Sequence, residues 1–528
     1  MTVIEGSVRQ SNLEEIILSA ENVISGRGNS EAAVEALATL VDAADDADNQ
    51  AALVKAIELA GHIEAKCLPK DACLVRYNRS NAWSALHRLR NRAQNAWSWE
   101  LPEFQEQVYW LRAAIQHEGY IQLPAPRRAQ LHCNLGNVLS EAGRFVDALG
   151  EWRHALHEQP ILGMASGNLG KGLVNYGLSL YDQDHTYWFL LRGKQELAKA
   201  VAGGVGRDGS TYPEALTHFE TCLAKVEHML DRYEPLDDDS LPTYSLGKTQ
   251  REQHYRQWSL ERHLFLNPLN DLDTHSIAAQ DVLLLPSHRA DKSGITFLAF
   301  FNQLKQEYTY ARWCLYEGSS CQRTHLADRD VMLAFNSDYA LYAMGLEQVK
   351  TAFRCAYSLL DKVAYFVNDY WQLGISEEKV NFRSVWVEVP KGKGRQVQVR
   401  QVFDTSKSLP LRGLFWLAKD IYNDRFRDVA HPSAKDLNSL RNHLEHKYVK
   451  IVDPLAKVTS QSGIFADRLA HMVERDELLS KTEHLLRLSR SALIYLCLAM
   501  HVEEQRTPSS SSFALPLDYG IYPDNLKM

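Results

Sequence analysis

The amino-acid sequence predicts a nearly all-α protein, in which a solenoid of helical repeats is followed by an antiparallel helical bundle with a small β-hairpin insertion. Three observations support this fold class. A sequence repeat with a period of 34 residues lies in the first half of the chain. Long stretches with apolar residues at helical spacing lie in the second half, and two segments of alternating character flank a glycine turn between them.

Composition bounds the class of protein. A chain of 528 residues is too long for a single core, so two to four domains are expected. The eight cysteines form no C-x-x-C pair, which predicts a reducing compartment and no thiolate metal site. The first residues lack the pattern of a signal peptide, and no run approaches 18 apolar residues. We therefore expect a cytoplasmic protein that does not contact a membrane.

The repeat is centred on the tripeptide Asn134-Leu135-Gly136, which recurs as Asn168-Leu169-Gly170. Two further matches between the copies are Leu139 with Leu173 and Gly143 with Gly177. The first copy is then followed by a small, an aromatic, a small and a proline residue, namely Ala148, Trp152, Ala155 and Pro160. This pattern resembles the tetratricopeptide (TPR) repeat, in which small residues let paired helices approach and the aromatic fills the gap. The sequence thus predicts a TPR-like helical repeat domain over residues 1–230.

The region after the repeats changes in character. Residues 231–248 are acidic and carry prolines and a glycine, so they read as a linker. We assign residues 231–330 to a linker and connecting helical region, residues 331–507 to the helical bundle and residues 508–528 to a C-terminal tail.

Two long helices and a hairpin are expected inside the bundle. Apolar residues at helical spacing predict one helix around residues 349–367 and another over about 476–505. Between them, residues 385–389 and 396–402 alternate strictly around the glycine turn 390–394, which predicts a β-hairpin. Because its turn is basic, the hairpin is a candidate RNA-binding finger.

The segment that carries chemistry runs from Arg441 to Tyr448. It spells R-x4-H-x-Y, with Asn442 directly after the arginine and His446 as the histidine. The signal Ser433–Asp436 predicts a helix start, and the buried stripe would be Leu437, Leu440 and Leu444. At about 100° per residue, Asn442 and His446 then lie one turn apart on the opposite face, and Arg441 lies on the flank.

These side chains are the groups that metal-free cleavage of a phosphodiester needs. A guanidinium binds and neutralises phosphate, an amide orients it, and an imidazole, which titrates near neutral pH, moves the proton. Residues 331–450 carry a net charge of about +5 although the whole chain carries −8, so a phosphate-bearing partner such as RNA would meet this region first. The substrate-binding candidates are Lys447, Tyr448, Lys391, Lys393, Arg395 and Arg400.

The motif and its position late in a bundle resemble the HEPN (higher eukaryotes and prokaryotes nucleotide-binding) ribonucleases, over about the last 200 residues. The R-x4-H-x-Y version is similar to that of bacterial HEPN toxins. The resemblance implies a metal-independent endoribonuclease that needs no cofactor, with Arg441, Asn442 and His446 as catalytic residues. Attack by the ribose 2′-OH makes such a reaction specific for RNA. The resemblance also implies a homodimer, in which two motif helices face each other and form one composite site.

The resemblance implies a biological setting as well. The repeat domain would bind a protein or peptide partner and regulate the nuclease, in a bacterial stress response or in antiviral defence against phage. In the similar toxins, an antitoxin adenylylates the tyrosine that corresponds to Tyr448. A tyrosine that simply closes the helix end is the alternative.

Other interpretations stay open. The motif helix could present only a solvated face, with Glu445 paired to Arg441. A zinc site at His443 and His446 is disfavoured because zinc helices space their histidines at i and i+4, and no third ligand is evident. Asp361 and Lys362 either support the motif or form a surface pair. A non-catalytic scaffold that binds nucleotides or proteins would share the same fold.

Overall fold

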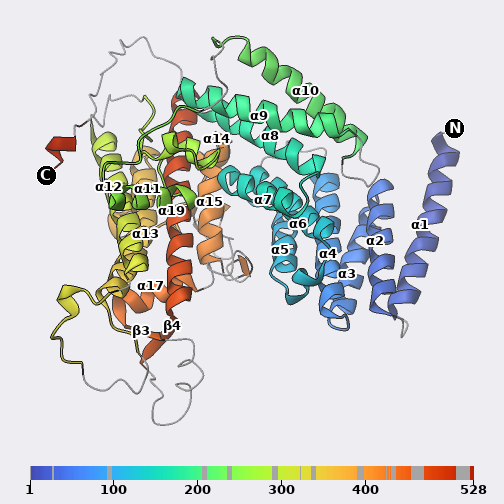
Figure 1. Cartoon of the computed structure of the whole chain (residues 1–528). Coiled ribbons are helices and arrows are strands. Elements are labelled where there is room, and N and C mark those ends of the chain that lie inside the picture. The colour runs from blue at the N-terminus through green and yellow to red at the C-terminus, as the bar shows by residue number, and fades with distance from the viewer. Residues whose placement is uncertain are drawn as a thin grey trace.

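The computed structural model is predominantly helical, as the sequence predicted (Figure 1). It describes residues 2–25, 29–91, 98–204, 211–234, 241–287, 295–321, 323–333, 340–388, 398–423, 425–426, 429, 436–452, 469–506, 522 and 524–527.

The N-terminal half is a stack of consecutive helices, each packed against the next (Figure 1). Short connections favour such antiparallel neighbours. The bounds are α1 Thr2–Ser25, α2 Ser30–Asp46, α3 Gln50–Glu64, α4 Pro69–Asn91, α5 Pro102–Ile115, η1 Glu118–Gln122, α6 Ala125–Glu141, α7 Phe145–Glu158, α8 Gly163–Ser179, α9 Gln183–Gly203 and α10 Pro213–Leu230.

The repeated glycines let these helices approach closely. A Cβ atom on Gly136 would lie 2.6 Å from the Trp152 ring, and one on Gly170 would lie 2.8 Å from the Gly193 carbonyl oxygen. Trp152 is 3% exposed, so it fills the gap as the repeat pattern predicts. The repeat equivalence weakens at its end, because Gly143 forms a turn with φ of +83° whereas Gly177 lies inside α8.

A connecting region leads from the repeats to the C-terminal bundle. It contains α11 Gln250–Glu261 and the short 3₁₀ helices η2 Pro268–Asp271 and η3 Ser276–Ala278. Chain without regular secondary structure follows η3 as far as residue 287. This region contacts both halves of the molecule: Arg153 of α7 donates to the Leu272 carbonyl, and Lys305 of α12 donates to the Leu283 carbonyl.

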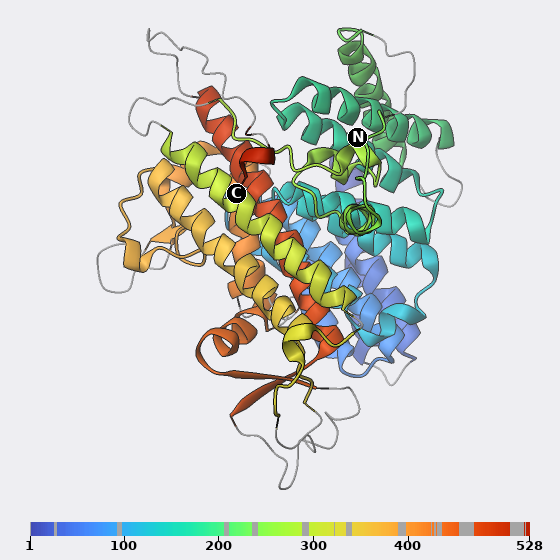
Figure 2. The same cartoon turned by 60° about the vertical axis from the view of Figure 1, so that its left-hand side comes forward.

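The bundle is built around α12, α13 and α19, which run side by side (Figure 2). The predicted long helices are confirmed: the apolar positions of α13 from Val349 to Val367 are buried, and α19 is buried over most of its length. The bounds are α12 Thr296–Ser320, η4 Leu326–Asp328, α13 Met344–Tyr370, η5 Glu377–Lys379, α14 Gln401–Ser406, α15 Leu409–Tyr422, α17 Leu437–His446, α19 Arg475–Arg506 and η7 Asp524–Leu526.

Two small sheets accompany the bundle. The predicted hairpin is confirmed at its base, where β1 Val387–Glu388 pairs antiparallel with β2 Gln398–Val399. A second pair was not predicted: β3 Tyr448–Val452 runs parallel to β4 Ala470–Glu474, and Ala340 bridges to Val452 on the other side. β3 continues from α17, and β4 leads directly into α19.

A buried ionic cluster joins the repeats to the bundle. Arg112 of α5 and Arg144 at the start of α7 both donate to the Asp420 carboxylate of α15, with the shortest distance 2.6 Å in each case. All three side chains are at most 5% exposed. Nearby, the Tyr495 hydroxyl of α19 donates to Asp147 of α7. Pairing of this kind is what allows charges to be buried.

The same junction brings two backbones into contact. A Cβ atom on Gly143, in the turn between α6 and α7, would lie 2.1 Å from the Leu409 carbonyl oxygen of α15. A Cβ atom on Gly413 would lie 2.4 Å from the Gly143 carbonyl oxygen. Only glycine fits this approach and tolerates the positive φ of residue 143.

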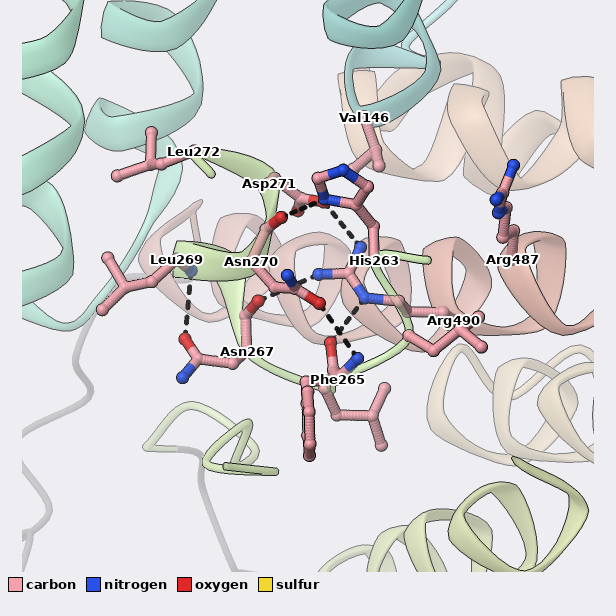
Figure 3. A network of polar contacts seen from close by, with 12 residues as sticks. Val146, His263, Phe265, Asn267, Leu269, Asn270, Asp271, Leu272, Arg487 and Arg490 are labelled. Carbon is pink, nitrogen blue, oxygen red and sulfur yellow. Dashed lines mark hydrogen bonds and ion pairs between the residues drawn. The ribbon is translucent and has the colours of Figure 1, made fainter. Parts of the chain in front are cut away.

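A second buried network holds the connecting region (Figure 3). Arg490 of α19 binds the Asp271 carboxylate at 2.7 Å and donates to the Phe265 and Asn267 carbonyls. The Tyr176 hydroxyl of α8 donates to the other oxygen of Asp271 at 3.0 Å. Asp271 thus links the segment from Phe265 to the end of η2 to the repeats on one side and to the bundle on the other.

Among the described residues, α19 alone is long and apolar enough to cross a membrane by length and composition. However, 83% of its apolar window is buried inside the protein. This burial is typical of the central core helix of a soluble protein.

Candidate functional site

The motif helix α17 is short and is oriented by its leucines. Leu437, Leu440 and Leu444 are at most 7% exposed and pack toward α13 and α15, which confirms the predicted stripe. The described helix begins at Leu437, after Asp436 in the left-handed conformation with φ of +64°. The start signal predicted at Ser433 lies outside the described residues.

Arg441 is half-buried and held by its neighbours. Its guanidinium lies over the ring of Tyr357 from α13, 5.6 Å from the centroid, and donates to the Asn442 side-chain oxygen at 3.1 Å. The Tyr357 hydroxyl in turn donates to Asn438 at 3.1 Å. α13 therefore orients the arginine of the motif through one aromatic ring.

A carboxylate and a second tyrosine share this environment. Burial raises the pKa of Asp361, while the Phe382 N–H and the charge of Arg441 act in the opposite direction. Burial also raises the pKa of Tyr357, to about 12, and that of Tyr422 well above its usual value. Asp361 thus interacts electrostatically with Arg441, whereas Lys362 binds Glu307 of α12. Of the two interpretations of Asp361 and Lys362, the structure favours support by Asp361 only.

His446, Lys447 and Tyr448 are exposed. His446 ends α17, and the Lys447 N–H caps the helix by donating to the His443 carbonyl at 3.1 Å. Tyr448 does not close the helix but begins β3, with 40% of its surface exposed. The end of the motif is thus accessible to a ligand, whereas Arg441 is held in place by Tyr357. A site for a phosphate group needs both an accessible end and a fixed cation.

His443 has a partner that the sequence did not reveal. Its ring stacks on His471 of β4, with centroids 4.5 Å apart, and its Nδ1 lies 2.7 Å from the Ser439 carbonyl oxygen. Burial, and then the neighbouring His443, lower the pKa of His471. No sequence signal links the two histidines, because 27 residues separate them. Within the described ranges, no three His, Cys, Asp or Glu side chains gather as metal ligands.

The remaining charged groups of the helix have other partners. The Glu445 carboxylate lies 3.9 Å from Arg354 of α13, so the structure does not show the ion pair with Arg441 that the simplest interpretation expected. Arg354 also donates to the Leu444 carbonyl at 2.9 Å. α13 therefore contacts the motif helix near both ends, through Arg354 at Leu444 and through Tyr357 at Asn438.

The basic hairpin is placed only at its base. Lys391, Lys393 and Arg395 lie outside the described residues. Arg400 donates to the Val385 carbonyl at 2.9 Å and lies 3.6 Å from Glu388, so it braces the two strands where they leave the bundle. Burial lowers the pKa of its guanidinium.

The comparison with protein families agrees with this architecture. Residues 288–503 match the model of the LA2681-like HEPN family, a range that contains α12, α13, α17 and most of α19. Neither the curated proteins nor the solved structures gave a match to this chain. The match supports a HEPN domain in the C-terminal part of the chain, and it indicates a role in RNA cleavage or nucleotide binding at the level of the family.

Proposed function

We propose that the chain is a metal-independent RNA endonuclease whose catalytic residues are Arg441, Asn442 and His446. The observation that carries this proposal is their arrangement on one short helix of the HEPN-like bundle. Arg441 is half-buried and oriented by Tyr357, while His446 lies exposed at the helix end. A fixed cation beside an accessible acid–base group suits a phosphodiester substrate.

The chemistry follows from these groups. His446 removes the proton of a ribose 2′-OH, and the 2′-oxygen attacks the adjacent phosphorus. The bond from phosphorus to the 5′-oxygen breaks, and a protonated histidine supplies the proton to that oxygen. The products are a 2′,3′-cyclic phosphate and a 5′-hydroxyl. Arg441 stabilises the charge that grows on the phosphate, and Asn442 positions the phosphate beside it.

One histidine cannot act as base and acid at the same moment. We therefore propose a homodimer in which two copies of α17 face each other and supply two motifs to one site. Lys447 and Tyr448, which are exposed beside His446, would contact the RNA backbone and a base. The helical repeats would act as a regulatory arm, in a bacterial stress response or in defence against phage.

One observation favours a second candidate, a binding module without catalysis. In the single chain, the Asn442 side-chain oxygen accepts a hydrogen bond from Arg441, so it already has a partner within the motif. A scaffold that binds nucleotides or proteins would need no more than this.

The test is cleavage of total RNA in EDTA by the purified full-length protein. His446→Ala and Arg441→Ala should each lower the cleavage rate about 100-fold or more, and the fragments should carry 2′,3′-cyclic phosphate and 5′-hydroxyl ends. His443→Gln is the matched control, because it removes an imidazole from the same helix outside the proposed trio. Cleavage that needs added metal, or that survives both alanine substitutions, would contradict the proposal.

A further inference from the structure

A hollow of about 610 Å³ lies where the repeats and the connecting region meet. Its walls come from the start of α9, from Tyr233 and Glu234 after α10, from Pro242, and from the segment between Asn267 and Val282. A second hollow of about 220 Å³ adjoins it, since the two share Asp182, His185 and Val282, and it reaches Ile494 and Leu498 of α19. The larger hollow alone has the size of a typical ligand site.

The charge of this junction hollow is one-sided. Three carboxylates line it, from Asp182, Asp184 and Glu234, and none of the described lining residues is a lysine or an arginine. His185 adds no positive charge at neutral pH, because burial lowers the pKa of its imidazole despite the nearby carboxylates Asp182 and Asp184. A ligand that fits must therefore bring positive charge.

Aromatic rings stand beside the carboxylates. Tyr187 and Tyr233 pack with ring centroids 5.4 Å apart, and Trp188 lies against Tyr187 at 5.3 Å. All three line the hollow. Aromatic faces combined with carboxylates bind an ammonium or guanidinium group by both charge and cation–π attraction.

The adjoining edge is apolar. Val282 and Leu284 belong to the segment after η3, which has no regular secondary structure, and are 40% and 55% exposed. Leu283 between them is 5% exposed, so two apolar side chains face solvent on either side of a buried one. The lining of the two hollows thus changes from acidic and aromatic to apolar. The two hollows together have room for more than one side chain.

We propose that the junction hollow binds an extended segment of a partner protein, with an arginine or lysine among the aromatic rings and apolar residues along Val282 and Leu284. The hollow is built on the loop that Arg490 holds, since Asn267 and Leu269 line it and Asp271 follows in the same turn (Figure 3). A peptide there touches the same loop that α19 binds. That this contact regulates the nuclease rests on the proposed function, whereas the binding site does not.

The experiment measures binding of a fluorescein-labelled octapeptide of alternating arginine and alanine by anisotropy, without RNA. Asp184→Asn combined with Glu234→Gln, and separately Tyr233→Leu, should weaken binding about tenfold. The matched control is Glu214→Gln combined with Glu220→Gln, which makes the same change of charge on exposed positions of α10. The control should weaken binding less than about twofold.

Three results would overturn the proposal. The first is an equal loss of peptide affinity in the control and in the pocket variant. The second is equal binding of a peptide with glutamate in place of arginine. The third is an equal affinity for spermidine, which would identify the ligand as a small cation. Because the assay contains no RNA, its failure leaves the cleavage experiment untouched, and a failed cleavage experiment leaves the binding result valid.

Discussion

At the scale of single residues, the role of Tyr357 shows what a sequence pattern leaves out. The R-x4-H spacing and the leucine stripe predicted which residues lie together on α17 and which face is buried. The spacing did not reveal that a ring from α13 lies under Arg441, because Tyr357 is 84 positions earlier and reads simply as a buried helical residue. The stacking of His471 on His443 was not predicted for the same reason. Contacts between distant elements depend on packing, which one local pattern does not encode.

A pair of substitutions at Tyr357 separates its ring from its hydroxyl. Tyr357→Phe keeps the ring under Arg441 and should change the RNA cleavage rate by less than about threefold. Tyr357→Leu removes the cation–π contact and should lower the rate about 3- to 30-fold, the range of that interaction. Tyr365→Leu, on the exposed side of the same helix, serves as control. Equal effects of the two Tyr357 variants, at unchanged melting temperature, would argue against a positioning role of the ring.

At the scale of elements, regular patterns were predictable and isolated strands were not. Helices α13 and α19 and the hairpin base follow from periodicity and from the glycine turn. The parallel pair of β3 and β4 does not. Residues 448–452 are rich in β-branched side chains, which was the available signal, but four of the five are buried and no alternation appears. Ala470–Glu474 has weak strand propensity and runs straight into α19, so its pairing depends on the bundle around it.

The turn between α6 and α7 offers a sharp test of the junction. Gly143→Ala places a Cβ against the Leu409 carbonyl at a residue with positive φ, and should lower the free energy of unfolding by about 2 kcal/mol. Gly150→Ala is the control, because a Cβ there meets nothing within 4 Å inside α7. It should be neutral or stabilising by up to about 1 kcal/mol. Thermal and denaturant unfolding measure both, and a neutral Gly143→Ala would refute the close backbone contact.

At the scale of the whole molecule, the repeats and the bundle share one core. A single hydrophobic cluster extends from Cys73 to Met500, and the partners of Asp420 are 308 and 276 positions away along the chain. The division into residues 1–230, 231–330 and 331–507 stays a prediction. The sequence could not predict the ionic cluster. Each of its residues has the sequence context of a solvent-exposed charge on a helix, and only the packing of the two halves brings them together.

Removing the carboxylate from this cluster should uncouple the halves. Asp420→Asn leaves the buried Arg112 without its carboxylate partner and Arg144 with Asp147 alone, and should cost about 3 kcal/mol at neutral pH. Asp45→Asn breaks an exposed pair with Arg88 and should cost less than about 1 kcal/mol. Denaturant unfolding compares the two, and equal small losses would show that the cluster does not hold the halves together.

The same carboxylate predicts a dependence on pH. Burial alone would raise the pKa of Asp420, but Arg112 and Arg144 outweigh it and hold the pKa below the usual value of 3.8. A carboxyl with a lowered pKa stabilises the folded state above pH 3.8, and that contribution is lost as the pH falls through the lowered pKa. Asp420→Asn should therefore lose less stability than the wild type on acidification below pH 3.8. An unchanged difference between the two proteins across that range would contradict the assignment.

The uninterrupted passage from β4 into α19 has a mechanical consequence. Arg490 lies 16 residues beyond Glu474, or roughly 24 Å along a helix at 1.5 Å per residue. A helix is a stiff rod over that length, so the start and the middle of α19 turn about the long axis together. The middle holds the Asp271 loop through Arg490, and the start continues from β4, the strand that pairs with β3 after the motif helix. Torque applied at either of these two points is thus transmitted to the other.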